Sequence, residues 1–247
     1  VLLMDWLLTM AEERGEKPQD KVAVSTIVSS AMPDVLARAR GFEMRRVLTG
    51  FKYIGDQIDQ LKDAGEEDRF LMGFEESYGY LVGTHARDKD AIVATMLCVE
   101  MASWYAARNM DLYEAMDALY QRYGYYLNGV VNAAYPGAEG AAKMAQIMSS
   151  LRKNPLEMVG NYKVVGVTDY AECAEMPRVS GLQKEAPQTL PASNVIEYRL
   201  EGDNKVIFRP SGTEPKVKAY LFANGKTREE AEARIAELIE AAQKVLS

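Results

Sequence analysis

The sequence predicts an α/β protein in two parts: a three-layer αβα domain with a mixed, largely parallel sheet, followed by a smaller α+β domain. Two observations predict this division. In the first half of the chain, apolar strand-like runs alternate with helix-like segments, as in βαβ units. After the Asn154-Pro155 pair, strand-like runs follow one another without long helices between them, which is typical of an antiparallel sheet.

The first part is punctuated by glycines that follow its predicted helices. Strands are predicted at residues 21–28, 44–48 and 69–74, and helices at 2–14, 33–40 and 53–64. The next helix, 90–108, is apolar on nearly all sides, which predicts that it is buried. In the helix at 111–123, Asp111 and Glu114 have the spacing of an N-cap and its reciprocal acid.

The second part is expected to begin where the composition changes, at Tyr135-Pro136-Gly137, so the domains are predicted to span 1–135 and 136–247. A helix at 140–153 precedes strands at 162–168, 195–200, 205–208 and 217–222. Residues 202–204 are expected to form a hairpin turn, and the polar segment 174–191 a long loop. A closing helix starts at Thr227, which forms a capping box with Glu230.

Composition excludes several classes of protein. A length of 247 residues, 48% of them hydrophobic and 26% charged, is typical of globular proteins, and the apolar stretches are too short for a membrane span. Two separated cysteines and one histidine make a zinc or iron–sulfur site improbable. The net charge of −7 argues against a nucleic-acid surface. Without a signal peptide or an initiator Met, we expect a cytoplasmic chain that begins inside a longer protein.

Residues 208–218 form the most informative segment: a short apolar strand, a turn with two hydroxyl groups, and a second strand. The three basic residues of this segment and Lys205 just before it, against one acid, give this region a net charge of +3 within an acidic chain. Guanidinium, hydroxyl and backbone N–H groups around a glycine all donate to phosphate oxygens. The segment therefore predicts a phosphate site, with an ordinary hairpin turn as the alternative. Its candidate ligands are Arg209, Ser211, Gly212, Thr213, Lys216 and Lys218.

A second polar group gathers where the predicted parallel strands end, which is where α/β sheets bind ligands. The loops at these ends are Ser29-Ser30, residues 49–52 and residues 75–77. The carboxylates of Glu75 and Glu76, with the Ser77 hydroxyl beside them, could accept hydrogen bonds from sugar hydroxyls. The alternative is that Glu75 and Glu76 cap or flank the next segment in solvent. The following loop, residues 83–90, carries alternating charges and the histidine. A phosphate loop together with a hydroxyl-binding loop predicts a phosphosugar site.

These segments resemble three motifs of the α-D-phosphohexomutases, in the same order and over essentially the whole chain. Gly-Phe-Glu-Glu-Ser-Tyr-Gly at 73–79 resembles the family's sugar-binding loop, and residues 209–215 resemble its C-terminal phosphate loop. Residues 49–52 resemble its hexose-recognition loop. The bacterial phosphoglucomutases are the most similar branch, with phosphomannomutases and phosphopentomutases as further relatives.

The resemblance implies a four-domain parent enzyme that interconverts glucose 1-phosphate and glucose 6-phosphate. A phosphoserine and a Mg²⁺ ion act in its N-terminal half, and glucose 1,6-bisphosphate is the intermediate and activator. The family's serine motif and its Asp-x-Asp-x-Asp-Arg metal loop are absent from this sequence. The resemblance therefore implies family domains three and four, the fourth with a TATA-binding-protein-like fold. The implied partners are a hexose phosphate and the missing N-terminal domains, without nucleic acid or membrane.

Carried over by position, the resemblance assigns sugar contacts to Glu75 and Ser77, and a loop that responds to substrate orientation to Thr49, Gly50 and Phe51. It assigns contacts to the non-reacting phosphate to Arg209, Ser211, Gly212 and Thr213. Lys89 matches a basic residue near the reaction centre, with His85, Arg87 and Lys52 as further candidates for substrate binding. The alternatives are that Lys89 pairs with Asp88 or Asp90, that His85 is structural, and that Lys52 is solvated. The fragment alone is expected to be inactive, and a non-catalytic sugar-phosphate-binding module remains an alternative.

Overall fold

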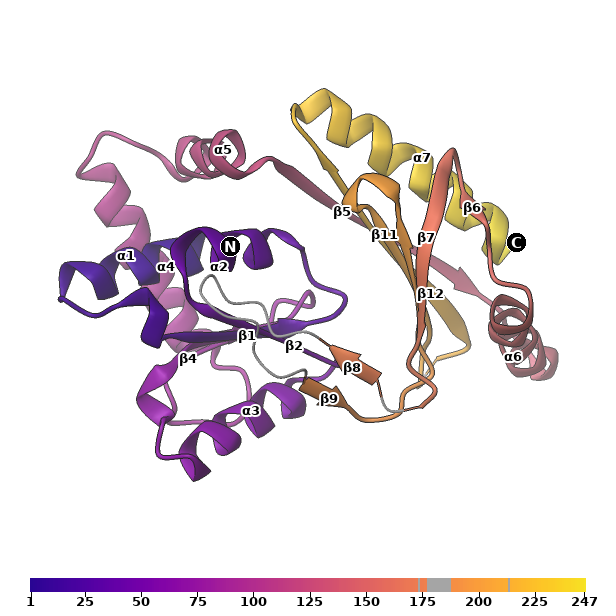
Figure 1. The fold of residues 1–247 in the computed structure, drawn as a ribbon, viewed down its shortest axis with the longest axis horizontal. Coiled ribbons are helices and arrows are strands. Elements are labelled where there is room, and N and C mark those ends of the chain that lie inside the picture. The colour runs from indigo at the N-terminus through magenta and orange to yellow at the C-terminus, as the bar shows by residue number, and fades with distance from the viewer. Residues whose placement is uncertain (173, 177–187, 213) are drawn as a thin grey trace. The chain divides into compact units, whose positions relative to one another are not determined.

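The computed structural model describes residues 1–172, 174–176, 188–212 and 214–247 as two compact units (Figure 1). Unit 1 holds Val1–Tyr123 together with the described residues of Glu175–Gln188. Unit 2 holds Gly124–Ala174 and the described residues of Thr189–Ser247. Each unit has its own sheet and its own buried cluster, so each is described by itself.

Unit 1 is built on a mixed sheet with the strand order β2-β1-β3-β4. β1 (Val22–Thr26) pairs in parallel with both β2 (Glu43–Val47) and β3 (Phe70–Phe74). β4 (Tyr80–Val82) is antiparallel to β3 and follows it through a tight turn. The predicted mixed, largely parallel sheet is confirmed.

Helices cover both faces of this sheet, because alternate side chains of each strand point to opposite sides. Ala23, on one face, belongs to the cluster that buries apolar residues of the helices α1 (Leu2–Glu13) and α2 (Met32–Arg40). Its neighbours Val22 and Val24 face α3 (Phe51–Asp63) in a second cluster. The three-layer prediction is therefore confirmed. The remaining helical segments are η1 (Pro18–Asp20), η2 (Glu67–Arg69), α4 (Ala91–Ala106) and α5 (Leu112–Tyr123).

Local signals fix the ends of these helices as the sequence predicts. Pro33 lies in the first turn of α2, and Gly41 ends it in the left-handed conformation, with φ of 87°. At the start of α5, the Glu114 backbone N–H donates to Asp111 Oδ1 at 2.8 Å and the Asp111 N–H donates to Glu114 Oε2 at 2.9 Å. The predicted reciprocal cap is confirmed.

The prediction that the apolar helix at 90–108 is buried is wrong for most of α4. Within this helix only Ala94 and Met101 are buried, whereas Ile92 is 75% exposed. The side that carries Leu97, Met101 and Trp104 packs on the cluster shared with α1. An all-round apolar sequence therefore packs on one side and is exposed on the other.

Unit 2 is an α+β unit whose six-stranded sheet has the order β5-β12-β11-β10-β7-β6, with each neighbouring pair antiparallel. The helices are α6 (Ala138–Lys153) and α7 (Arg228–Leu246). The predicted mainly antiparallel sheet is confirmed. Its strands are β5 (Tyr125–Ala134), β6 (Met158–Val159), β7 (Tyr162–Asp169), β10 (Ile196–Leu200), β11 (Lys205–Pro210) and β12 (Lys216–Gly225), with η3 (Glu201–Asp203) between β10 and β11.

Two features of this half differ from the sequence prediction. The long strand β5 was not predicted, and it pairs with β12 from Tyr125 opposite Gly225 to Ala134 opposite Lys216. Because of this pairing, the units divide after Tyr123 rather than at residue 135. The segment expected to be a long loop, 174–191, contains a two-stranded sheet of β8 (Ala174–Met176) and β9 (Gln188–Leu190).

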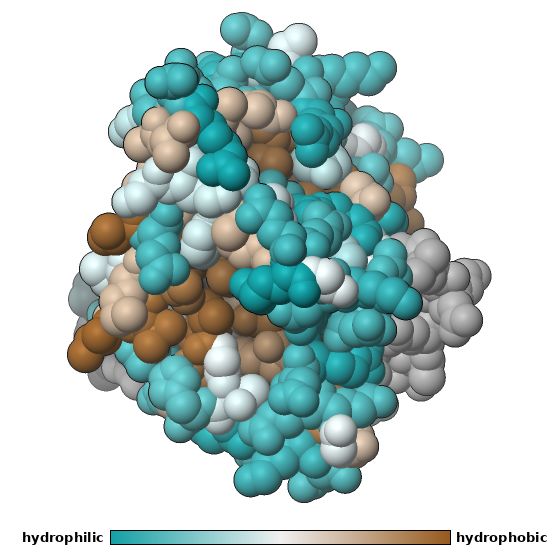
Figure 2. All heavy atoms as spheres, turned by 90° about the vertical axis from the view of Figure 1, so that its left-hand side faces the viewer, coloured by the Kyte–Doolittle hydropathy of each residue, from teal (hydrophilic) through white to brown (hydrophobic). Residues whose placement is uncertain are grey.

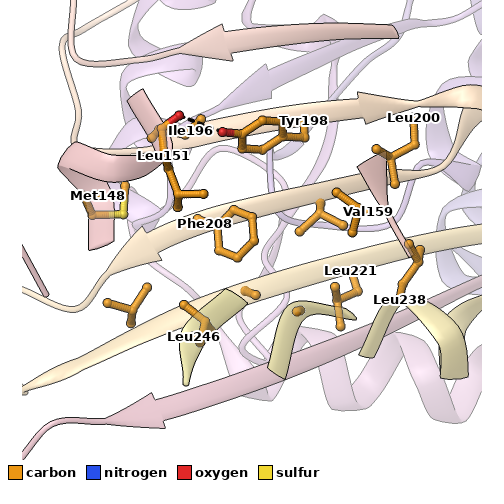
Figure 3. Packing of buried hydrophobic residues seen from close by; sticks show 14 of the residues in the cluster. Met148, Leu151, Val159, Ile196, Tyr198, Leu200, Phe208, Leu221, Leu238 and Leu246 are labelled. Atoms are coloured by element: carbon orange, nitrogen blue, oxygen red, sulfur yellow. Dashed lines mark hydrogen bonds between the residues drawn. The ribbon is translucent and has the colours of Figure 1, made fainter. Parts of the chain in front are cut away.

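The core of unit 2 lies on one face of its sheet, under α6 and α7 (Figure 3). Tyr198 and Phe208 meet edge to face with ring centroids 6.0 Å apart. The Tyr198 hydroxyl donates to the Leu151 carbonyl of α6 at 2.8 Å, which gives this buried phenol a partner. Leu238 and Leu246 of α7 complete the cluster. Because strand residues alternate, the residues next to Phe208 lie on the opposite face of the sheet.

In the part of the chain that the structure describes, no helix combines the length and hydropathy needed to cross a bilayer.

Leu221→Ala should lower the free energy of unfolding of unit 2 by about 2–5 kcal/mol, because it opens a cavity in a packed core. Leu221 is fully buried in this cluster. The matched control is Val165→Ala on the same sheet, where the side chain is 64% exposed and the loss should stay within about 1 kcal/mol. Chemical denaturation followed by circular dichroism measures both. Equal losses would contradict the assigned core face.

Candidate functional site

The turn between β3 and β4 holds the predicted sugar-binding acid, Glu75, against the protein. The Glu75 backbone N–H donates to the Gly79 carbonyl at 2.9 Å, and Tyr78 adopts a left-handed φ of 63° within the turn. The Glu75 side chain folds back over Gly79, where an added Cβ would lie 2.6 Å from Glu75 Oε1. Any side chain at position 79 would therefore displace the Glu75 carboxylate from this position.

Lys89 joins two of the three predicted motifs. Its Nζ lies 3.9 Å from Glu75 Oε1 and 5.4 Å from the centroid of the Phe51 ring. It also pairs with Asp88 Oδ1 at 3.1 Å, which was the alternative foreseen from the sequence. The Glu75 side chain is 9% exposed, whereas that of Lys89 is 51% exposed. Phe51, Glu75 and Lys89, hereafter the Lys89 cluster, thus place a carboxylate and an ammonium group side by side.

In the Lys89 cluster, the Glu75 carboxylate is partly desolvated. Burial raises the pKa of Glu75 above its ordinary value, and the neighbouring acids Glu76 and Asp88 also raise it. The Lys89 ammonium opposes this shift. A partly desolvated carboxylate accepts hydrogen bonds strongly, so hydroxyl groups of a ligand could replace the lost water.

Glu76, the second acid of the motif, accepts hydrogen bonds from a network of hydroxyl groups. Thr26 Oγ1, at the end of β1, donates to Glu76 Oε2 at 2.8 Å. The same hydroxyl lies 2.9 Å from Ser29 Oγ, and the Ser77 hydroxyl donates to Glu76 Oε1 at 3.4 Å. Thr26 and Ser29 are buried. The network therefore connects the ends of β1 and β3, and sequence reasoning missed Thr26 altogether.

Arg46 fixes the loop that follows β1. Its guanidinium donates to the carbonyls of Thr26 at 3.0 Å and Ser30 at 2.6 Å, and to both carboxylate oxygens of Asp34. The Arg46 side chain is 7% exposed. The pair Arg45-Arg46 within β2 is the sequence signal for this contact. A guanidinium on a buried strand needs several fixed acceptors, so the pair indicates a network of polar partners around it.

The loop at residues 49–52 starts α3, and its members differ in exposure. Gly50 has a φ of 123° and precedes the helix, which favours glycine there. Phe51 is buried in the cluster between α3 and the sheet, so its packing role is clear. Thr49 is half-buried. Lys52 is exposed, with its Nζ 4.7 Å from the centroid of the Tyr53 ring.

His85 and Arg87 have structural partners in the loop before α4. His85 Nε2 lies 2.9 Å from Asp90 Oδ2, and Asp90 caps α4 by accepting from two backbone N–H groups. Arg87 donates to Asp59 Oδ1 of α3 at 2.6 Å and to the Thr84 carbonyl at 2.7 Å. These contacts tie the loop to α3 and to the start of α4, so the loop is held in position near the Lys89 cluster.

In unit 2, the predicted phosphate ligands Arg209 and Lys218 occupy opposite positions on β11 and β12. They flank the buried Phe208 and Ala219, so they lie on the sheet face opposite the core. The Arg209 guanidinium donates to the Tyr220 hydroxyl at 3.4 Å, and Lys218 Nζ lies 6.0 Å from the centroid of the same ring. The strand pairing thus brings two cations together beside one phenol.

The turn from β11 to β12 is closed by its own hydrogen bonds. The Ser211 N–H donates to the Lys216 carbonyl at 2.8 Å, and the Glu214 N–H donates to Ser211 Oγ at 3.3 Å. Lys216 Nζ pairs with Glu214 Oε2 at 2.5 Å and lowers the pKa of that carboxyl. Gly212 is exposed, and beyond its chain neighbours no described atom lies within 4 Å of a Cβ added there, so its backbone is accessible. Thr213 lies outside the described residues.

Two hollows of the structure lie away from the predicted site. They measure about 390 and 620 Å³, run along α6 and share Lys143 and Gln146. None of the residues that line them belongs to the predicted site. The residues described contain no group of three or more His, Cys, Asp or Glu side chains suited to a metal ion.

Comparisons with known proteins agree with the motifs. Residues 2–123 match the family described as phosphoglucomutase/phosphomannomutase, alpha/beta/alpha domain III. A phosphoglucomutase of Staphylococcus aureus (strain bovine RF122 / ET3-1) is 33% identical over 87% of this chain and 38% of its own length. A phosphoglucomutase of Staphylococcus haemolyticus (strain JCSC1435) is 32% identical over 90% of this chain and 39% of its own length.

Among solved structures, pp63/parafusin from Paramecium, a phosphoglucomutase in its open form, superimposes with a TM-score of 0.67. It is 17% identical and covers 99% of this chain and 40% of its own, so it supports the fold. The chain spans about two fifths of the length of the curated relatives named above. Residues 2–123 therefore belong to the phosphoglucomutase/phosphomannomutase family, as its alpha/beta/alpha domain III, and the chain is similar to phosphoglucomutases over most of its length.

Proposed function

We propose that this chain is the sugar- and phosphate-binding part of a phosphoglucomutase that interconverts glucose 1-phosphate and glucose 6-phosphate. The observation that carries the proposal is the Lys89 cluster, in which Glu75 and Phe51, from two of the motif loops, meet one ammonium group. These loops belong to the segment that matches domain III. The curated relatives with the same segment are phosphoglucomutases.

In this proposal, Glu75 and Ser77 bind ring hydroxyls of the sugar. Lys89, beside Glu75, neutralises the negative charge of a substrate phosphate group that comes close to the Glu75 carboxylate. A buried carboxylate gains from hydroxyl donors because they replace the water that burial removed. Thr49, Gly50 and Lys52 lie at the start of α3, next to the buried Phe51 that contacts Lys89. His85 and Arg87 support the same site by fixing the loop that carries Lys89.

The non-reacting phosphate is assigned to unit 2. Arg209 and Lys218 supply charge on one sheet face, while Ser211 and the accessible backbone of Gly212 supply neutral donors in the turn. Thr213 belongs to the same motif. Lys216 would have to exchange its Glu214 partner for the phosphate, since the two form an ion pair here.

The chemical step is assigned to polypeptide beyond this chain. Phosphoryl transfer in this family class depends on a nucleophile, a metal ion and accurate positioning. Because the described residues offer no acidic metal cluster, we assign the phosphoserine and the Mg²⁺ ion to N-terminal domains of a longer cytoplasmic enzyme. Glucose 1,6-bisphosphate is then the intermediate that this part holds while it reorients.

Two alternatives keep the same site. A phosphomannomutase or phosphopentomutase would place a different sugar over Glu75, and comparing the turnover of the three sugar phosphates distinguishes them. A non-catalytic sugar-phosphate-binding module would bind the ligand but would yield no turnover with any N-terminal partner. We favour the enzyme because the curated relatives that share this segment are mutases.

Arg209→Ala should weaken binding of glucose 6-phosphate about tenfold or more, because a guanidinium–phosphate contact is a charge-assisted hydrogen bond. A titration of the chain followed by nuclear magnetic resonance measures the dissociation constant. The control is Arg199→Ala, an exposed arginine on the neighbouring strand β10, which should leave the constant within about twofold. If both variants bind like the unsubstituted chain, Arg209 is not the phosphate ligand.

The stability of the chain relative to Glu75→Gln should fall as the pH rises through the raised pKa of Glu75. A carboxyl whose pKa is higher in the folded state contributes stability below its unfolded value of 4.5 and loses it as it ionises. The neutral Gln variant lacks this loss. Urea denaturation of both proteins between pH 4 and about pH 7 measures the difference. If the relative stability stays constant, the pKa of Glu75 is not shifted by folding, and if it rises with pH, the site stabilises the carboxylate; either result contradicts the prediction.

The isolated chain should not convert glucose 1-phosphate, because the groups that transfer the phosphoryl group are assigned to other domains. A coupled dehydrogenase assay measures turnover. Adding the N-terminal domains of a phosphoglucomutase such as the S. aureus relative should produce turnover, and Arg209→Ala should remove it. Turnover by the chain alone would falsify this division of labour.

A further inference from the structure

The exposed side of α4 is the least explained surface of unit 1. Ile92, Met96 and Val99, hereafter the α4 patch, are 75%, 58% and 62% exposed. Their spacing places them in one row along the helix. Figure 2 shows apolar side chains gathered on the side of the molecule where α1 and α4 lie in Figure 1.

The helix around the α4 patch carries almost no charge. Glu100 is the single ionisable acid or base among its sixteen residues apart from Cys98 and Tyr105. Glu100 is exposed, and the remaining exposed positions of the helix are small: Ala91, Thr95, Cys98, Ser103 and Ala106. Helices that are apolar all round are normally buried, and large exposed apolar patches mark interaction sites.

The helix is firmly held, so the exposure is not that of a frayed end. Asp90 caps its first turn with two hydrogen bonds, from the N–H groups of Ile92 at 2.9 Å and Val93 at 3.1 Å. Its other side packs through Met101 on the cluster shared with α1. The α4 patch is therefore presented on a rigid support, which lowers the entropic cost of binding a partner.

The comparisons indicate what covers the patch. This chain spans 38% of the S. aureus relative, and the match at residues 2–123 is a third domain. Leu2, where that match begins, packs in the same cluster as Leu97 and Trp104 of α4. In a longer relative, the polypeptide that leads into domain III would therefore arrive beside α4.

We propose that the α4 patch is the docking surface for the domain that precedes domain III in a phosphoglucomutase. The inference rests on the proposed function, which assigns the catalytic groups to those preceding domains. It adds the surface through which they are held against the sugar-binding part. An uncharged row of flexible and branched apolar side chains fits a second apolar face rather than an ion, a nucleic acid or a charged peptide.

The test mixes this chain with the N-terminal domains of the S. aureus phosphoglucomutase, ending where its match to residue 2 begins. Met96→Cys, combined with Cys98→Ser and Cys173→Ser, leaves a single thiol in the chain and places it in the α4 patch. Light scattering should give a one-to-one complex, and modification of the thiol at position 96 by a thiol reagent should slow about tenfold or more on mixing. Val99→Lys should weaken the complex about tenfold or more, because it places a charge in an apolar interface.

The matched control is Val165→Lys on β7, where the side chain is 64% exposed against 62% for Val99, and it should change the affinity less than about twofold. The docking proposal is overturned if no complex forms, if the thiol at position 96 reacts at the same rate in the complex, if Val99→Lys has no effect, or if that thiol is instead protected by a dimer of this chain. Turnover distinguishes the two proposals. A complex without mutase activity contradicts the proposed function alone. Mutase activity that is insensitive to Val99→Lys contradicts the docking surface alone.

Discussion

The parallel pairing of β1 with β2 and β3 is the constraint on which the candidate site of unit 1 depends. Parallel strands end at the same edge of a sheet, so the segments that follow them are brought together although they are distant in sequence. Thr26 at the end of β1 reaches Glu76 after β3 only because this register holds. Lys89 then joins the two neighbouring loops through Phe51 and Glu75.

A different constraint organises unit 2. The alternation of side chains along antiparallel strands sends Phe208 into the core and Arg209 to the opposite face. The core therefore holds the strand ladder that brings Arg209 opposite Lys218, and packing on one face sets the spacing of charges on the other. The proposed phosphate site would need no cavity in the unliganded unit, because its donors are fixed by strand pairing and by the closed turn.

The sequence was sufficient for the local features and insufficient for those that need tertiary contact. Capping residues, strand–helix alternation and the three motifs depend on short-range chemistry, so Asp111 and the turn at Glu75 could be located in advance. The strand β5 escaped prediction because Asn128, Gly129 and Asn132 interrupt its apolar residues, and its pairing with distant β12 supplies the missing stability. The hydroxyl network below Glu76 joins residues fifty positions apart, which no local pattern encodes.

The helix α4 shows how a failed prediction can carry information. Its composition predicted burial on all sides, and the fold of unit 1 satisfies that requirement on one side only. Burial of large apolar side chains is the dominant favourable term in folding and association, so keeping Ile92, Met96 and Val99 in water forgoes that gain along a whole row. A sequence selected for an exposed helix would place charged residues there, as the outer faces of α3 and α7 do. The composition of α4 is therefore that of a helix adapted to two packed neighbours, of which unit 1 supplies one.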